Sequence, residues 1–327
     1  MRYLVIIITG LLAGLAVPVL AAPVPAGAST WSLTAVGDIM LDRNVWAKIK
    51  QYGKDYPFAK ITPQLKGVDV VLGNLEGPFT NSTKHAVSGG SLIFNFDPVM
   101  APILKRAGLT TLSLANNHTL NQGQRGLNAT RTTLKKNGIE YFGDPRNGTN
   151  YHLTKTINGE RVTFLGYDNL DGKIAPVLLD VKRARQKGEY VIVVPHWGAE
   201  YQLGIQPKLQ QQAKQLVDAS ADMILGGHPH VVEPFEIYKS KFIAYSLGNF
   251  IFDQYFSSDT QQGLMLKLAF TASTVTVNVI PLVSSKSQIA VADGAVKAKM
   301  LERIAKDSVV SSTIRDGIRQ GTFSVTK

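Results

Sequence analysis

The clearest indication of the fold is the stretch MILGGHPHV at residues 223–231. Met223 to Leu225 is a short, β-rich apolar run of the kind that forms a buried strand. His228 and His230 follow two residues apart, and in an extended segment this spacing turns both imidazole rings toward one face. Pro229 restricts the backbone between them. An isolated His-x-His pair is also found as a surface coincidence, so the prediction of a site here needs support from the rest of the chain.

The same arrangement of an apolar run followed by a polar cluster occurs four more times. The runs are Leu33–Val36, Val68–Leu72, Thr110–Leu114 and Val191–Val194, and the clusters after them are Gly37-Asp38, Gly73-Asn74-Leu75-Glu76, Asn116-Asn117-His118 and His196-Trp197-Gly198. In open α/β sheets, ligands gather beyond the carboxyl ends of the strands. We therefore expect the five clusters to converge on one site.

Each cluster alone also has a structural interpretation. Asp38 could cap a helix over Met40–Ile49, and the asparagines could occupy turns or caps. A single histidine such as His196 is often a hydrogen-bonded structural residue. Glu76 is harder to explain in this way, because it follows a very apolar strand and a buried carboxylate needs a partner. Five such coincidences at five strand ends would be improbable, whereas a two-metal site requires about this many ligands.

The pattern of elements predicts a layered α/β fold. Amphipathic helical segments alternate with the apolar runs, and a more purely β region follows from residue 235. Asn158-Gly159 between two β-rich segments predicts a type I′ hairpin turn. The division expected is a leader and tether at residues 1–30, one domain at residues 31–284, and a basic helical extension at residues 285–327.

Composition limits the chemistry of the site. The chain has 327 residues, no cysteine, 35 Lys plus Arg against 24 Asp plus Glu, and a formal charge of +11. Without cysteine, a disulfide, an Fe–S cluster, a thiolate zinc site and a cysteine nucleophile are all excluded, so His, Asp, Glu or Asn must hold any metal. The basic excess favours polyanionic partners without identifying one.

The N-terminal segment resembles an export signal. Leu4 to Ala22 is almost wholly apolar behind the single charge of Arg2, and it ends in the small residues Ala21 and Ala22. Two interpretations remain open, a cleaved leader and an uncleaved membrane anchor, because about 20 apolar residues can span a bilayer. Both predict an extracytoplasmic protein, either secreted or anchored at the cell surface.

The order of the motifs resembles the CapA family of poly-γ-glutamate capsule biosynthesis proteins, which belongs with the calcineurin-like metallophosphoesterases. The resemblance extends from about Ser32 to about Pro281. It is carried by Gly37-Asp38-Ile39-Met40, Asn74-Leu75-Glu76, Ala115-Asn116-Asn117-His118, the run from His196 to Tyr201, Gly227-His228-Pro229-His230-Val231, and the run from Tyr245 to Phe252. It implies a four-layer αββα sandwich with a dinuclear metal centre.

The resemblance also implies roles for individual residues. Asp38 and His230 would bind the first metal, Glu76 would bridge the two ions, and Asn117, His196 and His228 would bind the second. His118 would be the catalytic histidine that assists the leaving group. Supporting contacts are expected from Asn74, Asn249 and Glu200, with Glu200 orienting His196. The donors are oxygen and nitrogen, which suits two divalent ions, Mn²⁺ first and Fe or Zn²⁺ as alternatives.

Three positions depart from the family pattern, and they make metal binding better supported than catalysis. Met40 stands where the superfamily has a histidine ligand, Asn121 where many members carry an aspartate near His118, and Glu233 where a glutamine is common. The first hypothesis is therefore a metal-dependent hydrolase with phosphoesterase-type chemistry. The second is a non-catalytic, metal-containing subunit that binds or handles an anionic polymer such as poly-γ-glutamate, within a membrane synthase or export complex.

The second hypothesis draws on two basic runs. Lys182, Arg183, Arg185 and Lys187 form one, and Lys135-Lys136 with Arg125 and Arg131 form the other, although each is also explained as a solvated helix face. Nucleic acid is not an expected partner, because no recognised nucleic-acid module is present and the protein is expected to be exported.

Overall fold

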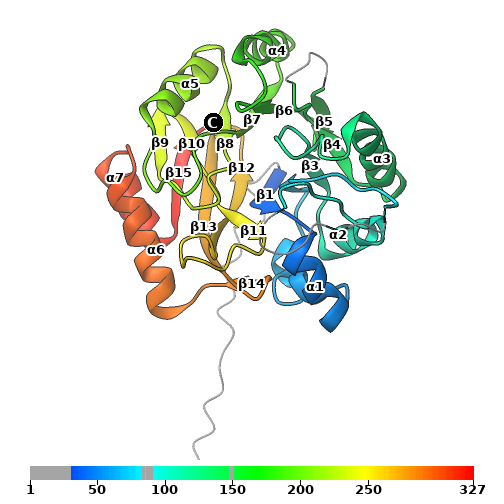
Figure 1. Ribbon diagram of the computed structural model, residues 1–327. Coiled ribbons are helices and arrows are strands. Elements are labelled where there is room, and N and C mark those ends of the chain that lie inside the picture. Colours follow the sequence, from blue (N-terminus) through cyan, green and yellow to red (C-terminus); the bar gives the residue numbers. More distant parts are fainter. Residues whose placement is uncertain (1–30, 83–84, 86–90, 147–150) are drawn as a thin grey trace, which may run out of the picture.

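The strands form two sheets (Figure 1). The computed structural model describes residues 31–82, 85, 91–146 and 151–327. The larger sheet runs β14-β13-β12-β1-β2-β3-β4, with β11 paired to β1 and β15 paired to β13, and the smaller sheet runs β5-β6-β7-β8-β10-β9. The strand bounds are β1 Trp31–Ile39, β2 Val70–Leu75, β3 Thr111–Ser113, β4 Glu140–Phe142, β5 Leu153–Ile157, β6 Glu160–Asp168, β7 Tyr190–His196, β8 Met223–Leu225, β9 Phe235–Tyr238, β10 Lys241–Ala244, β11 Asn249–Ile251, β12 Gln262–Phe270, β13 Thr274–Ser285, β14 Gln288–Val291 and β15 Thr322–Thr326.

Helices cover the outer face of each sheet, and side chains of both sheets fill the space between them (Figure 1). Helices α1 to α3 pack on the larger sheet, and α4 and α5 pack on the smaller one. This is the four-layer αββα sandwich that the family resemblance implies. The helix bounds are α1 Arg43–Tyr52, α2 Ala101–Ala107, α3 Gly123–Lys136, α4 Ile174–Gln186, α5 Pro207–Asp218, α6 Gly294–Asp307 and α7 Ser312–Gln320, with 3₁₀ turns at Tyr56–Phe58, Thr62–Leu65 and Pro98–Met100.

Parallel strands place the polar clusters at one edge of each sheet. Strands β1, β2 and β3 are parallel neighbours in the larger sheet, and Asp38 is in register with Asn74. Strands β6, β7 and β8 are parallel neighbours in the smaller sheet, and His196 bridges to Gly227 just beyond β8. The residues after these strands therefore meet between the carboxyl edges of the two sheets.

Several local predictions are confirmed and others need adjustment. Asn158 and Gly159 have φ angles of 48° and 91° and form the two-residue turn between β5 and β6. Helix α1 begins at Arg43 rather than Met40, and Asp42 is its capping residue, because the Asp42 carboxylate accepts the Arg43 N–H at 2.9 Å. Asp38 is therefore not used as a helix cap.

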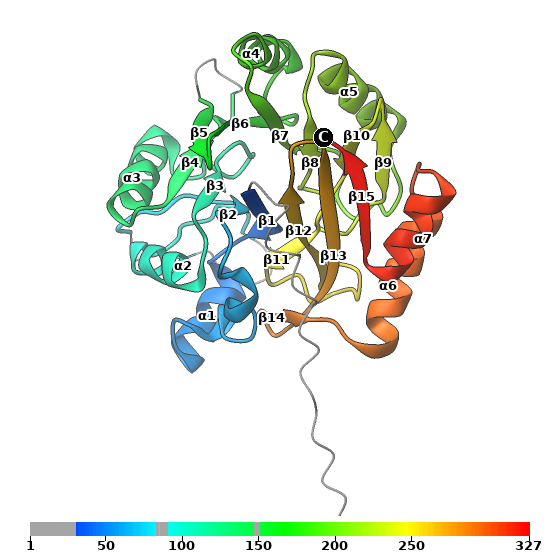
Figure 2. The same cartoon turned by 180° about the vertical axis from the view of Figure 1, so that it is seen from behind.

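The C-terminal segment is part of the sandwich (Figure 2). The expected helical extension is present as α6 and α7, and β15 then pairs with β13. Ile304, Ile318 and Phe323 belong to the core between the sheets. Because β13 itself runs to Ser285, residue 284 does not mark a structural boundary.

The expected leader at residues 1–30 lies outside the described residues, so its cleavage or anchoring stays a prediction. Within the part of the chain that the structure describes, no helix combines the length and apolar character required to span a bilayer.

Candidate metal centre

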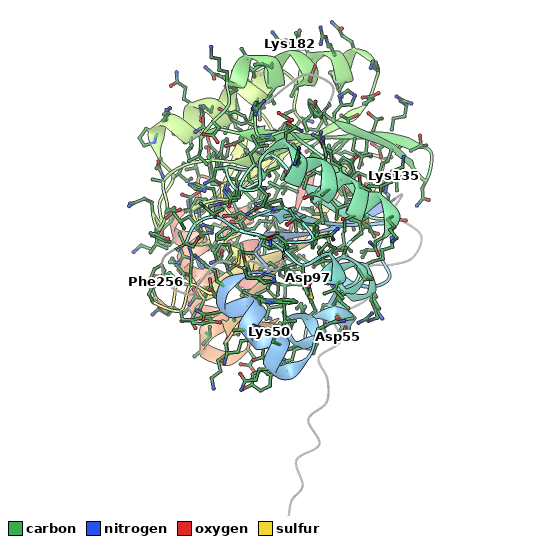
Figure 3. All side chains as sticks on the ribbon, turned by 45° about the vertical axis from the view of Figure 1, so that its right-hand side comes forward. Lys50, Asp55, Asp97, Lys135, Lys182 and Phe256 are labelled. Atoms are coloured by element: carbon green, nitrogen blue, oxygen red, sulfur yellow. The ribbon has the colours of Figure 1, made fainter. Side chains whose placement is uncertain are left out.

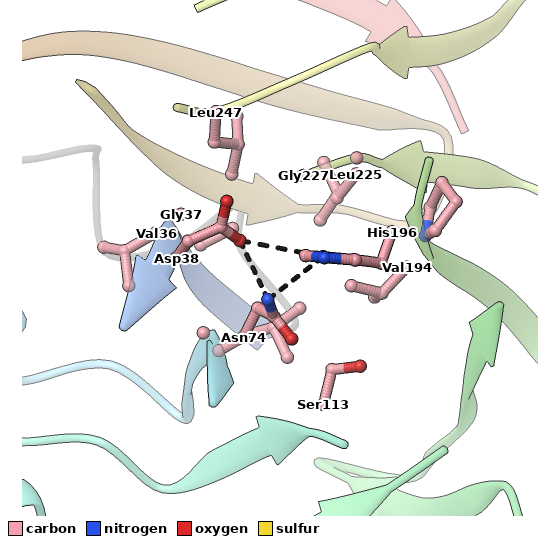
Figure 4. Close-up of a pocket in the computed structure, with 15 residues that line it drawn as sticks. Val36, Gly37, Asp38, Asn74, Ser113, Val194, His196, Leu225, Gly227 and Leu247 are labelled. Carbon is pink, nitrogen blue, oxygen red and sulfur yellow. Dashed lines mark hydrogen bonds and ion pairs between the residues drawn. The ribbon is translucent and has the colours of Figure 1, made fainter. Parts of the chain in front are cut away.

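The structure brings the predicted metal-binding side chains into one buried cluster. Asp38 and Asn74 lie one residue before the ends of β1 and β2, and His196 is the last residue of β7 (Figure 4). The Asn74 side-chain nitrogen lies 2.9 Å from Asp38 Oδ1 and 3.2 Å from His196 Nδ1, so this amide occupies the centre of the cluster. It also lies 3.5 Å from Glu76 Oε2. Asn74 is thus more central than the supporting position expected for it.

The donor atoms fall into two groups with separations that suit metal binding. In the first group, His230 Nε2 is 3.6 Å from Glu76 Oε1; His230 Nδ1 lies 3.4 Å from Asp38 Oδ2, but one ion can take only one of the two ring nitrogens. In the second group, His196 Nε2 is 3.1 Å from both Asn117 Oδ1 and His228 Nδ1. Two donors that each lie about 2.1 Å from one ion are themselves about 3.0–3.5 Å apart. The residues present therefore fit divalent ions held by oxygen and nitrogen.

One carboxyl oxygen of the cluster fits the role of a metal ligand. Glu76 Oε1 is buried and has no hydrogen-bond partner. It faces His230 and lies 3.8 Å from His118 Nε2. An uncompensated buried carboxylate oxygen is costly, and a cation would satisfy it.

The exposed Glu200 lies at a different place from the one expected. Its carboxylate is 4.0 Å from His230 Nε2, and it can share an ion with His228 and His230. The expectation that Glu200 orients His196 is therefore not met. In this alternative grouping, Asp38, Glu76 and His196 would hold the other ion.

Two of the three clustered histidines are neutral near pH 7, and the third is protonated. Burial lowers the pKa of His228 to about 4 with help from repulsion by His230, and burial also places the pKa of His196 well below its usual value. Burial acts in the same direction on His230, but attraction to Glu76 and Asp38 outweighs it and raises the pKa to about 9. His196 and His228 are thus neutral near pH 7, as metal ligands must be.

The two carboxylates of the cluster respond to burial in opposite ways. Burial raises the pKa of Glu76 well above its usual value. Burial also opposes ionisation of Asp38, but a hydrogen bond with His230 and attraction to His196 lower its pKa to about 2. Asp38 therefore carries the permanent negative charge of the site, and a bound cation would favour ionisation of Glu76.

Backbone constraints fix the two histidines after β8. His228 and His230 have φ angles of 95° and 59°, a region that non-glycine residues rarely adopt. A Cβ atom on Gly227 would lie 2.8 Å from Asp38 Oδ1, so only glycine allows this close approach. Asn249 Oδ1 lies 3.0 Å from His230 Nδ1 and thereby orients the ring, which agrees with its expected supporting role.

His118 is oriented by Asn121. Asn121 Oδ1 lies 3.0 Å from His118 Nδ1 and accepts the Phe94 backbone N–H at 2.7 Å. Because a backbone N–H can only donate, the atom facing His118 is the amide oxygen, and Nδ1 must carry the proton. Nε2 of His118 is then the nitrogen that faces Glu76. The residue at position 121 keeps the orienting hydrogen bond, although it lacks the charge of an aspartate.

A cleft of about 320 Å³ leads from the surface to His118 and His230. Its other lining residues come from four places, the start of α1, the segment before α2, the segment after β7 and the segment after β11: Arg43, Asn44, Leu92, Phe94, Glu200, Tyr201, Phe252, Asp253, Gln254 and Phe256. An external molecule can therefore reach one side of the cluster.

Sequence reasoning missed several residues around the site. Asn116 donates its side-chain N–H to Asn74 Oδ1 at 2.9 Å and fixes the central amide, although the sequence offered only a turn or cap role for it. Arg43 and Asp253 form an ion pair in the cleft. They are 210 positions apart, so no local pattern could join them. Met40 is fully buried in the core beneath α1.

The remaining two histidines, His85 and His152, lie outside the predicted motifs and are both partly buried. His85 Nδ1 lies 3.1 Å from Asp42 Oδ1, and its ring stacks on Trp46 at a centroid distance of 4.7 Å. His152 is half-buried. Neither belongs to the cluster of donors described above.

Comparison with known proteins identifies the family. Residues 32–254, more than half of the chain, match the model of the bacterial capsule synthesis protein PGA_cap. The chain belongs to the PGA_cap family. The capsule biosynthesis protein CapA of Bacillus anthracis is 33% identical over 304 residues, which cover 85% of this chain and 73% of that protein. The PGA biosynthesis protein CapA of Bacillus subtilis (strain 168) is 29% identical over 309 residues, covering 88% of this chain and 80% of that protein.

Solved structures add a more distant likeness. The protein TT1561 of Thermus thermophilus is 11% identical to this chain, with a TM-score of 0.42. The match covers 72% of this chain and 93% of TT1561. A score at this level adds nothing to what the PGA_cap family match and the geometry of this chain already give.

Proposed function

We propose that this PGA_cap protein acts outside the cytoplasm in the biosynthesis of a capsule of the poly-γ-glutamate type, as a metal-dependent hydrolase with a dinuclear centre. The observation that carries the proposal is the set of donor atoms in two groups, His230 Nε2 with Glu76 at 3.6 Å and His196 Nε2 with Asn117 and His228 at 3.1 Å, with Asp38 beside both groups. Asp38, His230 and Glu76 would hold one ion, and Asn117, His196 and His228 the other, with Glu76 shared. Mn²⁺ suits these donors best, and Fe or Zn²⁺ are the alternatives.

The residues of the cleft have different roles in the proposed reaction. Two divalent ions, when bound, supply a hydroxide nucleophile and neutralise the charge on phosphoryl oxygens. Asn121 fixes His118 with Nε2 toward the site, and when both ring nitrogens are protonated Nε2 would deliver its proton to the departing alkoxide. The Phe94 ring packs on the His118 ring at a centroid distance of 4.3 Å and helps to exclude water from this side.

The test is turnover by the purified protein reconstituted with Mn²⁺. We expect hydrolysis of phosphodiester or phosphomonoester substrates by the native chain, loss of this activity in His228→Ala, and normal activity in His152→Ala. The second variant removes a histidine outside the cluster and is the matched control. Absence of metal-dependent turnover of any ester or amide would rule out the proposed hydrolase.

Non-catalytic handling of an anionic polymer, in a membrane synthase or export complex, is the second candidate. The exposed run Lys182–Lys187 on α4 supports it, although Arg183 pairs with Asp180 and Arg185 with Asp222. Lys182 and Lys135 lie on the outer helices, at a different edge from Phe256 of the cleft (Figure 3). This candidate predicts salt-sensitive retention of polyglutamate that weakens when the charges of the α4 run are reversed.

A further inference from the structure

The hydrogen bonds of Asn249 decide which nitrogen of the His230 ring can bind an ion. The Asn249 side-chain nitrogen donates to the His230 carbonyl oxygen at 3.3 Å and to the Thr260 carbonyl oxygen at 2.9 Å. Backbone carbonyls only accept, so Asn249 Oδ1 is the amide atom that faces His230 Nδ1 at 3.0 Å. Asp38 Oδ2, which is also an acceptor, lies 3.4 Å from the same ring nitrogen. Nδ1 therefore keeps its proton, and Nε2 is the nitrogen that an ion can bind.

Two carboxylates lie on the Nε2 side of the His230 ring. Glu76 Oε1 is 3.6 Å from Nε2, and Glu200 Oε1 is 4.0 Å from it and lines the cleft. Glu200, His228 and His230 also offer one donor atom each within 4.8 Å of one another. Two donors of one ion are about 3.0–3.5 Å apart, so the Glu200 carboxylate would have to approach by about half an ångström. Its side chain is 41% exposed and has the room to do so.

The backbone beside Glu200 is tied to the segment that carries the two histidines after β8. The Tyr201 backbone N–H donates to the Pro229 carbonyl oxygen at 2.8 Å, and Tyr201 has a φ of 66°, a strained value for a non-glycine residue. The Tyr201 hydroxyl accepts the Gln254 side-chain N–H at 3.1 Å, and Gln254 Oε1 accepts an Asn249 side-chain N–H at 2.9 Å. Asn249 thus anchors both the imidazole ring and the residue that follows Glu200.

The charges at the inner end of the cleft favour a cation between the two carboxylates. Arg43 pairs with Asp253, which leaves Glu200 to face His230 with Glu76 on the other side of Nε2. Two carboxylates that approach one ring nitrogen repel each other unless a positive charge lies between them. A divalent ion bound to Nε2 would offset both negative charges.

We propose that Glu200 is a ligand of the ion that binds His230 Nε2, and that it reaches this ion from the open side of the cleft. The family resemblance implies only a supporting contact for Glu200, so this ligand is additional to the residues of the proposed centre. The inference rests on the proposed function for the presence of an ion at His230. A ligand at the mouth of the cleft is the one that an entering molecule can replace, so Glu200 also marks where such a molecule meets the centre.

The test measures Mn²⁺ binding to the metal-free full chain by isothermal titration calorimetry in the presence of a competing chelator. The native protein is compared with Glu200→Gln and with Glu302→Gln, a surface control whose carboxylate pairs with Arg319. Loss of a residue that only supports a ligand weakens metal binding about 10- to 100-fold, so Glu200→Gln should weaken one of the two ions by at least about tenfold. Glu302→Gln should bind both ions like the native chain.

Two further arms separate coordination from charge. Glu200→Asp keeps the negative charge but withdraws the carboxylate by one methylene group, so it should also bind one ion more weakly than the native chain. In 1 M NaCl the screening length is about 3 Å, so an effect of charge alone would disappear, whereas the loss of a ligand should persist. Far-ultraviolet circular dichroism establishes that each variant is folded, and Glu200→Asp decides the question if Glu200→Gln is not.

The possible outcomes distinguish this inference from the proposed function. Native-like Mn²⁺ affinity in Glu200→Gln or Glu200→Asp, or a loss that disappears in 1 M NaCl, would overturn the inference and leave the metal centre in place. A native chain that binds no Mn²⁺ would overturn the inference together with the proposed centre. Because no arm measures turnover, a chain that binds both ions and hydrolyses nothing refutes only the hydrolase.

Discussion

Replacing Glu233 by glutamine should change how stability depends on pH. Glu233 lies three residues beyond His230, is fully buried, and has no hydrogen-bond partner for either carboxyl oxygen. Burial raises the pKa of its carboxyl group from 4.5 to about 8. The folded chain therefore keeps this group protonated under conditions in which the unfolded chain releases the proton.

The sign and size of the effect follow from this difference in pKa. The stability that Glu233 contributes is fully present below pH 4.5 and is lost as the pH rises through about 8. Between these values the folded state binds one more proton, so the free energy of unfolding falls by about 1.4 kcal/mol for each pH unit. Glu233→Gln keeps a neutral side chain of similar size and should remove this slope.

Urea denaturation at pH 5, 6, 7 and 8 measures the free energy of unfolding directly. We expect the stability advantage of Glu233→Gln over the native chain to grow with pH by about 1.4 kcal/mol per unit, less any compensation by water near the carboxyl group. Glu302→Gln is the surface control, because Arg319 lowers the pKa of Glu302 and this carboxylate stays ionised throughout. If the three proteins have parallel pH profiles, then Glu233 is not a neutral buried acid and the reasoning is refuted.

Three other changes test separate parts of the account. A Cβ atom on Gly37 would lie 1.8 Å from the Gly248 carbonyl oxygen, so Gly37→Ala should lower the melting temperature sharply, and an unchanged value would contradict this packing. Asn249→Ala removes the acceptor of His230 and should weaken metal binding about 10- to 100-fold in a chelator competition, where native affinity would count against a positioning role. Deleting residues 294–327 exposes the core between the sheets and should yield aggregated protein in size-exclusion chromatography; a folded monomer would show that this segment is dispensable.

The sequence predicted the parts of the fold that depend on local pattern. Short β-branched runs marked β1, β7 and β8, and Asn158-Gly159 marked the hairpin, because each signal lies within a few residues. Strand β15 was missed, since its TFSVT sequence is short and half polar and its stability comes from pairing with β13, which lies far earlier in the chain. Tertiary pairing of this kind leaves little local trace.

The residues of the candidate site were also only partly predictable from the sequence. The polar residues after parallel strands could be predicted to converge, and Asp38, His196 and His228 do lie together. The direction of a long side chain could not be predicted, so Glu200 was assigned to the wrong histidine. The pairing of Arg43 with Asp253 depends on two loops that meet only in the folded chain.

The most direct test of the account is the number of metal ions that each chain binds. Protein stripped with a chelator and reconstituted with Mn²⁺ should contain two ions per chain by inductively coupled plasma mass spectrometry, and His152→Ala should keep both. His228→Ala should lose them together, because its ring lies 3.1 Å from His196 and shares the cluster with His230. A native protein that binds no metal under these conditions would contradict the central claim.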